Sequence, residues 1–145
     1  MRSLFTGLTT EVIGLQTYPA PTGTVNPDSN GNGYGVRVNQ SQYVYQGGSI
    51  MDAIIASGTP NAVTTTGQVG SGANPGVHGR TYASIVQDMV DSYAYGQYNA
   101  NSAARGSWRY SWNSGLDNSF AQWAALGMIP AGRNWGLVVR AWVEA

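Results

Sequence analysis

Residues 81–98, TYASIVQDMVDSYAYGQY, carry the clearest signal of local structure in the chain. Thr81 can cap a helix that runs from Tyr82 to about Tyr98, because its hydroxyl can accept a bond from a free amide of the first turn. Apolar side chains recur every three or four residues and predict one buried face. That face comprises Ile85, Met89, Val90, Tyr93 and either Tyr95 or Gln97. Asp88 and Asp91 are predicted on the opposite, solvent-exposed face.

Two further helices are predicted beyond this one, after an irregular stretch at 99–115 that is rich in Trp and Tyr. Asp117 can cap a helix from about 118 to 128, and Pro130 is expected to stop it or to kink the next turn. A last helix is expected from about 134 to 144. Its predicted buried residues are Trp135, Val138, Val139 and Trp142.

The N-terminal half predicts a helix, a turn-rich segment and a hairpin. Residues 3–16 carry an apolar stripe that favours a helix, which Pro19 and Pro21 would end. Gly, Asn and Asp dominate residues 22–35, as is typical of turns. Residues 36–38 and 42–45 alternate apolar and polar side chains, which predicts a short β-hairpin.

A glycine pair, Gly47-Gly48, is expected to end the second strand of that hairpin. Ser49 can then cap a helix to about Ala56, and a long polar loop follows at 59–80. Residues 1–145 are therefore predicted to form a single, mainly α domain. It would contain five helices arranged as stacked α-hairpins, with one small β-hairpin.

The composition excludes several classes of partner and site. Charged residues make up 10% of the chain, against about 25% in an average soluble domain. There is no lysine, and seven arginines balance seven acids, so a nucleic acid or an anionic membrane is not the expected partner. No run reaches the roughly 18 apolar residues of a membrane span. The absence of cysteine excludes disulfides, thiolate metal sites and a cysteine nucleophile.

Low net charge also favours association, because little repulsion keeps copies of the chain apart. Such a surface suits a protein that self-assembles, or an extracellular protein that glycans help to solvate. Asn39-Gln40-Ser41 is a glycosylation sequon, although so short a motif also occurs by chance.

A possible calcium loop begins at Asp28. Asp28, Asn30 and Asn32, with Gly33 following, match the first half of a calcium-binding loop, which needs oxygen ligands at alternate positions and a glycine at the sharp turn. The twelfth position is Asn39 instead of the usual bidentate glutamate. An ordinary turn rich in Asx residues and glycine explains the same pattern.

The chain shows no complete catalytic site. His78 is the single histidine, and a histidine in a loop or at a helix entry, without a metal-binding role, is its favoured interpretation. Asp88 and Asp91 are three residues apart on one helix and could act as an acid/base pair, although a solvated helix face is the favoured reading. No G-x-S-x-G nucleophile motif occurs.

Aromatic residues are the other candidate binding groups. Aromatic rings beside Asn, Gln and Ser are typical of carbohydrate platforms and of protein interfaces, but they can also fill a glycine-rich core. The candidates for an interface or ligand surface are Tyr43, Tyr45, Trp108, Tyr110 and Trp112.

Three segments, 105–110 (RGSWRY), 117–119 (DNS) and 122–123 (QW), resemble the repeat of the prenyltransferase and squalene-oxidase family of α/α-toroids, which includes the terpenoid cyclases. The resemblance implies a partial α/α-toroid. In it Gly106 would permit a tight turn and Trp108 and Tyr110 would fill the gap between paired helices. Asp117 would cap the next helix, and Gln122 with Trp123 would complete the motif, Gln122 tying the helix to a neighbouring loop.

The departures from that family argue against its enzymatic activities. The aspartate run with which cyclases protonate their substrate does not occur here, nor do the Asp, Cys and His that hold zinc in protein prenyltransferases. A closed toroid needs a much longer chain, so a partial toroid would bury its open faces against another copy. The sequence therefore predicts a non-enzymatic, self-assembling structural protein, an oligomer or filament subunit, extracellular and without a cofactor unless calcium binds. A terpenoid-cyclase-like fragment and a glycan-binding module are the alternatives.

Overall fold

The computed structural model describes residues 2–18, 23–67, 69–70, 76–100 and 102–144. The helices in this part of the chain are α1 (Arg2–Thr6), α2 (Tyr43–Ala56), α3 (Tyr82–Gly96), α4 (Asn118–Trp135) and α5 (Ala141–Glu144). The strands form two antiparallel pairs, β1 (Leu8–Val12) with β4 (Tyr34–Val38) and β2 (Gln16–Tyr18) with β3 (Gly23–Val25). The fold is thus helix-rich, with small sheets.

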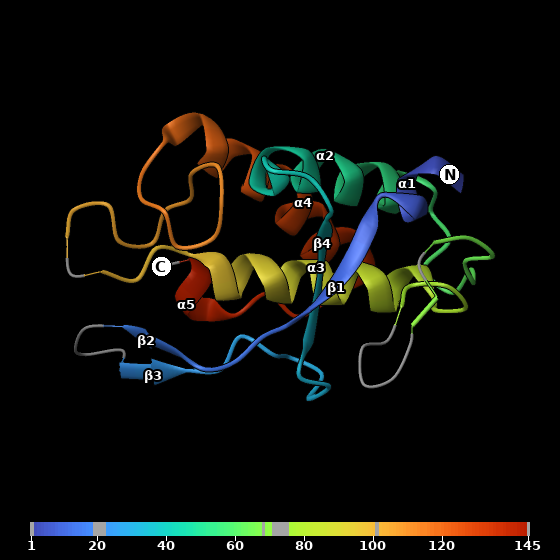
Figure 1. Cartoon of the computed structure of the whole chain (residues 1–145), viewed down its shortest axis with the longest axis horizontal. Coiled ribbons are helices and arrows are strands. Elements are labelled where there is room, and N and C mark those ends of the chain that lie inside the picture. Colours follow the sequence, from blue (N-terminus) through green and yellow to red (C-terminus); the bar gives the residue numbers. More distant parts are fainter. Residues whose placement is uncertain (1, 19–22, 68, 71–75, 101, 145) are drawn as a thin grey trace.

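Helix α3 lies at the centre of the fold (Figure 1). Strand β4 packs on it, and both α2 and α4 contact it as well as each other. The β2–β3 pair extends away from the helices at one side in the same view. Because α3 is covered from several directions, its side chains form much of the hydrophobic core.

The sequence correctly predicts the start and cap of α3, but the helix ends at Gly96 instead of about Tyr98, and its exposure was not predicted. Thr81 Oγ1 accepts a 3.2 Å bond from Ser84 N, as expected of a capping residue. All residues from 85 to 94 are buried, and Asp88 and Asp91 are only 0% and 1% exposed. The prediction of a solvent face was therefore wrong, because β4 and the preceding loop cover the side that was expected to meet water.

Helix α2 begins earlier than predicted and runs through the glycine pair. Residues 42–45 are not a strand, because Val44 starts a series of buried residues at helical spacing that continues to Ile55. Gly47 and Gly48 face neighbouring helices, and a Cβ on Gly48 would overlap the carbonyl of Trp123 in α4. The two glycines permit close packing of helices instead of ending a strand.

The predicted helix over residues 3–16 was also wrong. Only α1 is helical there, and β1 follows directly, pairing Leu8 with Val38 and Val12 with Tyr34. The β-branched Thr9 and Thr10 favour a strand once a partner is present. The predicted strand at 36–38 is confirmed within β4, but its partner is β1. The prolines expected to end the helix, Pro19 and Pro21, lie outside the described residues.

Helix α4 continues through Pro130 to Trp135, beyond its predicted end. Met128 and Ala131 are buried on either side of the proline, and their packing outweighs the loss of one backbone bond. Gly136, with φ of 64°, ends the helix, and bonds from Gly136 N and Leu137 N satisfy its last carbonyls. The predicted helix over 134–144 was therefore wrong at 136–140. Residues 134–135 belong to α4, and Ala141–Glu144 form the separate short helix α5.

Candidate functional site

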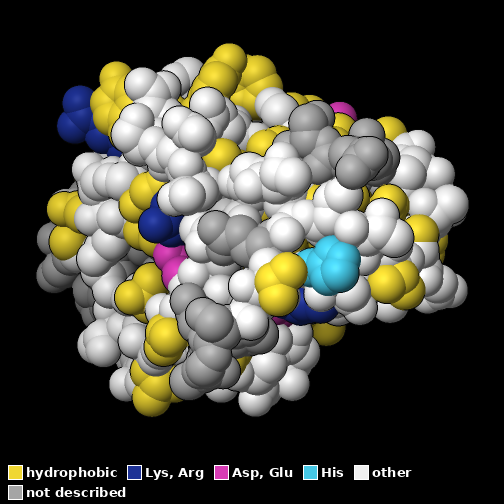
Figure 2. Space-filling model, turned by 45° about the vertical axis from the view of Figure 1, so that its right-hand side comes forward, with side chains coloured by type: hydrophobic (Ala, Val, Ile, Leu, Met, Phe, Trp, Pro, Cys, Tyr) yellow, Lys and Arg dark blue, Asp and Glu magenta, His cyan; other side chains and the backbone are white. Residues whose placement is uncertain are grey.

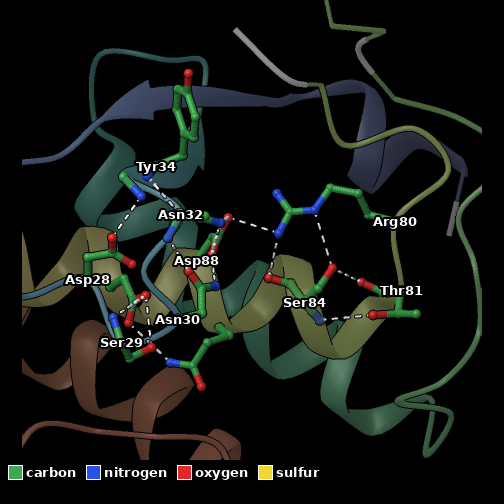
Figure 3. Close-up of polar contacts among 12 residues, drawn as sticks. Asp28, Ser29, Asn30, Asn32, Tyr34, Arg80, Thr81, Ser84 and Asp88 are labelled. Carbon is green, nitrogen blue, oxygen red and sulfur yellow. Dashed lines mark hydrogen bonds and ion pairs between the residues drawn. The ribbon is translucent and has the colours of Figure 1, made fainter. Parts of the chain in front are cut away.

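Loop 28–33 is anchored to α3 by two buried carboxylates, Asp88 and Asp91 (Figure 3). Asp88 accepts hydrogen bonds from two amide side chains of the loop. Asn30 Nδ2 lies 2.6 Å from Asp88 Oδ1, and Asn32 Nδ2 lies 2.9 Å from Asp88 Oδ2. Arg80, from the other side, places Nη2 2.8 Å from Asp88 Oδ2 in an ion pair. Asp88 therefore holds the loop while a guanidinium balances its charge.

Asp91 completes this attachment with a second set of donors. Its Oδ2 accepts from Ser29 N at 3.0 Å and from Ser29 Oγ at 2.9 Å. Its Oδ1 accepts from Gln87 Nε2 at 3.1 Å. Both oxygens of each carboxylate are thus occupied by protein donors away from solvent, so the favoured interpretation of a solvated pair is wrong. The geometry is that of a structural anchor.

Burial affects the protonation of Asp91. Its desolvation raises the pKa to about 6, from 3.8, although the bonds from Ser29 and Gln87 lower it and the nearby charge of Asp88 raises it further. The folded protein consequently holds a proton on Asp91 at a pH where the unfolded chain has released it.

This shift predicts that ionisation of Asp91 destabilises the fold as the pH rises from about 4 to about 6. The contribution of Asp91 to the free energy of unfolding is greatest below pH 4 and falls by on the order of 1–3 kcal/mol by pH 7. Urea unfolding of the natural protein and of Asp91→Asn at several pH values measures this directly. The stability of Asp91→Asn relative to the natural protein should decrease as the pH falls from 7 to 4.5. A pH-independent difference would contradict the assignment.

The calcium candidates lie together in this loop, with their polar atoms engaged by the protein. Asp28 accepts bonds from Gly31 N at 2.8 Å and Gly33 N at 2.7 Å. The side-chain oxygens of Asn30 and Asn32 accept backbone bonds within the loop, and their nitrogens donate to Asp88. In the described part of the chain, no three His, Cys, Asp or Glu residues form a group that could hold a metal.

Two other single-residue candidates lie at the surface. Asn39, in the sequon, is exposed just after β4. His78 is also exposed, with Nε2 3.0 Å from the carbonyl oxygen of Thr65, so it occupies a loop as predicted.

Three of the five aromatic candidates form an interior group with Tyr93. The ring centroids of Tyr43 and Trp112 are 4.7 Å apart, and Trp112 lies 5.1 Å from Tyr93. Trp108 is 6% exposed, and its Nε1 donates to the carbonyl of Tyr93 at 3.0 Å. Trp112 Nε1 donates to Glu11, a carboxylate whose pKa burial raises. Tyr43, Trp108 and Trp112 thus contribute mainly to packing.

The other two candidates, Tyr45 and Tyr110, belong to an outer aromatic group and are 41% and 44% exposed. Tyr45 packs edge-on against Trp123 with centroids 4.6 Å apart, and Tyr110 packs edge-on against Phe120 at the same distance. These rings surround the first turns of α4. They leave apolar edges at the surface instead of one flat platform.

The residues that resemble the α/α-toroid repeat lie in a turn, at a helix cap and on the surface. Gly106 has a φ of 84°, and its amide donates to the carbonyl of Tyr98 in a turn. Asp117 caps α4 by accepting bonds from Ser119 N and Oγ at 3.0 and 2.6 Å. Gln122 is exposed, and no hydrogen bond joins it to a loop within the described residues. The expected turn and cap are confirmed, whereas the tie through Gln122 is not present.

Helix α4 carries exposed apolar residues, some of them beside α2. Leu126 is 39% and Ile129 48% exposed, and Trp123 is partly exposed beside Tyr45. The helix carries no charged residue before Arg133. On the face of the molecule that Figure 2 shows, hydrophobic side chains form small separate groups and charged side chains are few.

A cavity of about 550 Å³ adjoins the same helix. Ala121, Ala125 and Gly132 of α4 line one side, and the C-terminal residues Leu137, Val139 and Val143 line the other. Asp88 does not line it. The cavity was not predictable from the sequence pattern, because residues 136–140 were expected to be helical. The pairing of Arg80 with Asp88 was not predicted either. The chain has seven arginines and no lysine, so each carboxylate has few possible cationic partners, and this was the one indication in the sequence.

Comparisons of the chain with family models, with curated proteins and with solved structures find no match. Among the described residues, no helix has both the length and the apolar character to cross a membrane.

Proposed function

We propose that this protein is a non-enzymatic structural module that self-assembles through the exposed face of α4. The observation that carries the proposal is the apolar character of α4 on more than its buried side. Leu126 and Ile129 are exposed, while Phe120, Ala124 and Met128 face the core. Exposed apolar side chains that adjoin one another mark interaction sites, so this part of α4, between the exposed Gln122 and Arg133, is expected to be covered in an assembly.

A second copy of the chain is the proposed occupant. The outer face, defined here as Trp123, Leu126 and Ile129 of α4 with the adjoining Tyr45 of α2, contains no charge, and the whole chain has no net charge. Two copies therefore meet without electrostatic repulsion. Across a two-fold axis the same face would supply both sides of the contact, with Leu126 of each copy packing beside α4 of the other.

The resemblance to repeats of α/α-toroids supports this proposal. The close packing of α2 on α4 at Gly48 and Gly127 is the kind of helical pair on which stacked repeats are built. In such an array each pair buries its outer face against a neighbour. We extend the proposal to a partial toroid and to an extracellular location, the latter because the charge-poor surface suits an assembled protein outside the cell.

The test is the oligomeric state of the natural protein and of Leu126→Asp, measured by size exclusion with light scattering over a range of concentrations. The natural protein should associate as its concentration rises. Leu126→Asp should stay monomeric, because association would bury an unpaired charge. Ala53→Asp, on the exposed side of α2, is the matched control and should associate like the natural protein.

Two results would sink the proposal. One is a natural protein that remains monomeric at every concentration. The other is a Leu126→Asp variant, folded by circular dichroism, that assembles as strongly as the Ala53→Asp control.

A further inference from the structure

The cavity beside α4 is lined on the helix by three small residues together with Met128 and Ile129. Ala121, Ala125 and Gly132 present little volume on the helix, and Leu137 and Val139 line the opposite wall. A Cβ on Gly132 would still lie 3.6 Å from the side chain of Val139, an ordinary contact distance. The helix and the C-terminal segment thus approach each other at Gly132 and enclose largely apolar space beside it.

The C-terminal wall continues directly from the end of α4, and hydrogen bonds also fix it to the far side of the cavity. Gln87 Nε2 donates to Val138 O, and Val138 N donates back to Gln87 Oε1, both at 2.9 Å. Gln97 Nε2 donates to Val143 O at 3.2 Å. Arg140 Nη2 donates to the carbonyl of Asp28 at 2.9 Å. Because these contacts tie the wall to α3 and to loop 28–33, it cannot move onto α4 to fill the space without breaking them.

Arg133 gives the cavity its one charged lining residue. It is exposed in the last turn of α4 and forms no ion pair with a described side chain. A guanidinium binds one carboxylate through two parallel hydrogen bonds. The carboxyl end of a helix is itself partly negative, which disfavours an anion of higher charge at this place.

We propose that this cavity binds an amphipathic monocarboxylate, with its apolar chain along Ala125 and Val139 and its carboxylate on Arg133. The volume of about 550 Å³ lies within the range of small-molecule sites, which combine apolar walls with a few polar groups. The single cation matches a single negative charge. The cavity adjoins the outer face of α4, because Ile129 lines it, whereas Leu126 does not.

Titration calorimetry with three ligands of equal chain length tests the site: decanoate, decanol and decyltrimethylammonium, each below its micelle concentration. Decanoate should bind most tightly and the ammonium compound most weakly. Arg133→Ala should weaken decanoate binding at least tenfold, because a charge-assisted contact is lost, and should leave decanol binding unchanged. Arg133 is exposed, so this variant is expected to fold.

A second variant tests the apolar part of the site. Gly132→Leu places a large side chain in the cavity and should abolish binding of both decanoate and decanol. Ala53→Leu, at an exposed position of α2, is the control and should bind like the natural protein. Equal affinity of the natural protein for decanoate and decanol, unchanged binding in Gly132→Leu, or no binding of decanoate would each overturn the proposal. The Leu126→Asp variant should bind decanoate normally, which separates this result from self-assembly.

Discussion

Asp88→Ala is expected to cost the protein about 3–5 kcal/mol of its free energy of unfolding. The substitution removes the acceptor of the bonds from Asn30 and Asn32 and leaves the Arg80 guanidinium, whose side chain is 20% exposed, without its carboxylate. Chemical denaturation followed by circular dichroism measures the loss. A typical domain has only about 5–15 kcal/mol in total, so the variant should be close to unfolding at moderate temperature.

Two further variants distinguish the loss of this anchor from a general effect. Asp52→Ala removes a carboxylate from a half-buried position on α2 that forms no ion pair with a described residue, and should change stability little. Combining Asp88→Ala with Arg80→Met should cost less than the sum of the two single changes, because the unpaired cation is gone. If the losses in the free energy of unfolding are additive, Arg80 and Asp88 do not stabilise the fold as a pair, contrary to the structure.

Gly48→Ala is expected to destabilise the fold by about 2–3 kcal/mol, even though alanine is the better helix former. Its Cβ would overlap the carbonyl of Trp123, a backbone atom that cannot rotate away, so α2 and α4 would have to separate. Thermal and urea unfolding measure the change.

Gly14→Ala is the matched control for this substitution. A Cβ on Gly14 would meet no atom within 4 Å, and its backbone is not in the left-handed region. The control should therefore be nearly neutral. Equal stability of the two variants would contradict the close approach of α2 to α4.

Local patterns predicted α3 well, because a cap and an apolar periodicity lie within the helix itself. The same patterns misplaced Asp88, since the donors that bury it belong to Asn30 and Asn32, which are 58 and 56 positions away. Likewise, the apolar pattern of residues 8–12 fits a helix, and only their pairing with β4 makes them a strand. A glycine pair can end a strand or helix, or it can allow two helices to pack closely. At Gly48 the nearby carbonyl of Trp123 shows that the second applies.

In the candidate site, too, local features could be predicted from the sequence, whereas contacts between distant segments could not. The turn-forming chemistry of loop 28–33 and the cap at Asp117 follow from side chains that bond to their own backbone. The division of the aromatic residues into an interior and an outer group depends on which element each ring packs against. Tyr43 and Tyr45 are two positions apart on α2, yet one contacts Trp112 and the other Trp123.

An intermolecular NOE measurement tests the proposed assembly most directly. Equal amounts of ¹³C-labelled and unlabelled protein are mixed, and isotope filtering selects contacts between copies. We predict contacts from the Leu126 methyl groups of one copy to the Trp123 ring or the Ile129 methyl groups of the other. Self-association with intermolecular contacts elsewhere, or a mixture that shows none at concentrations where the protein is soluble, would contradict the role assigned to α4.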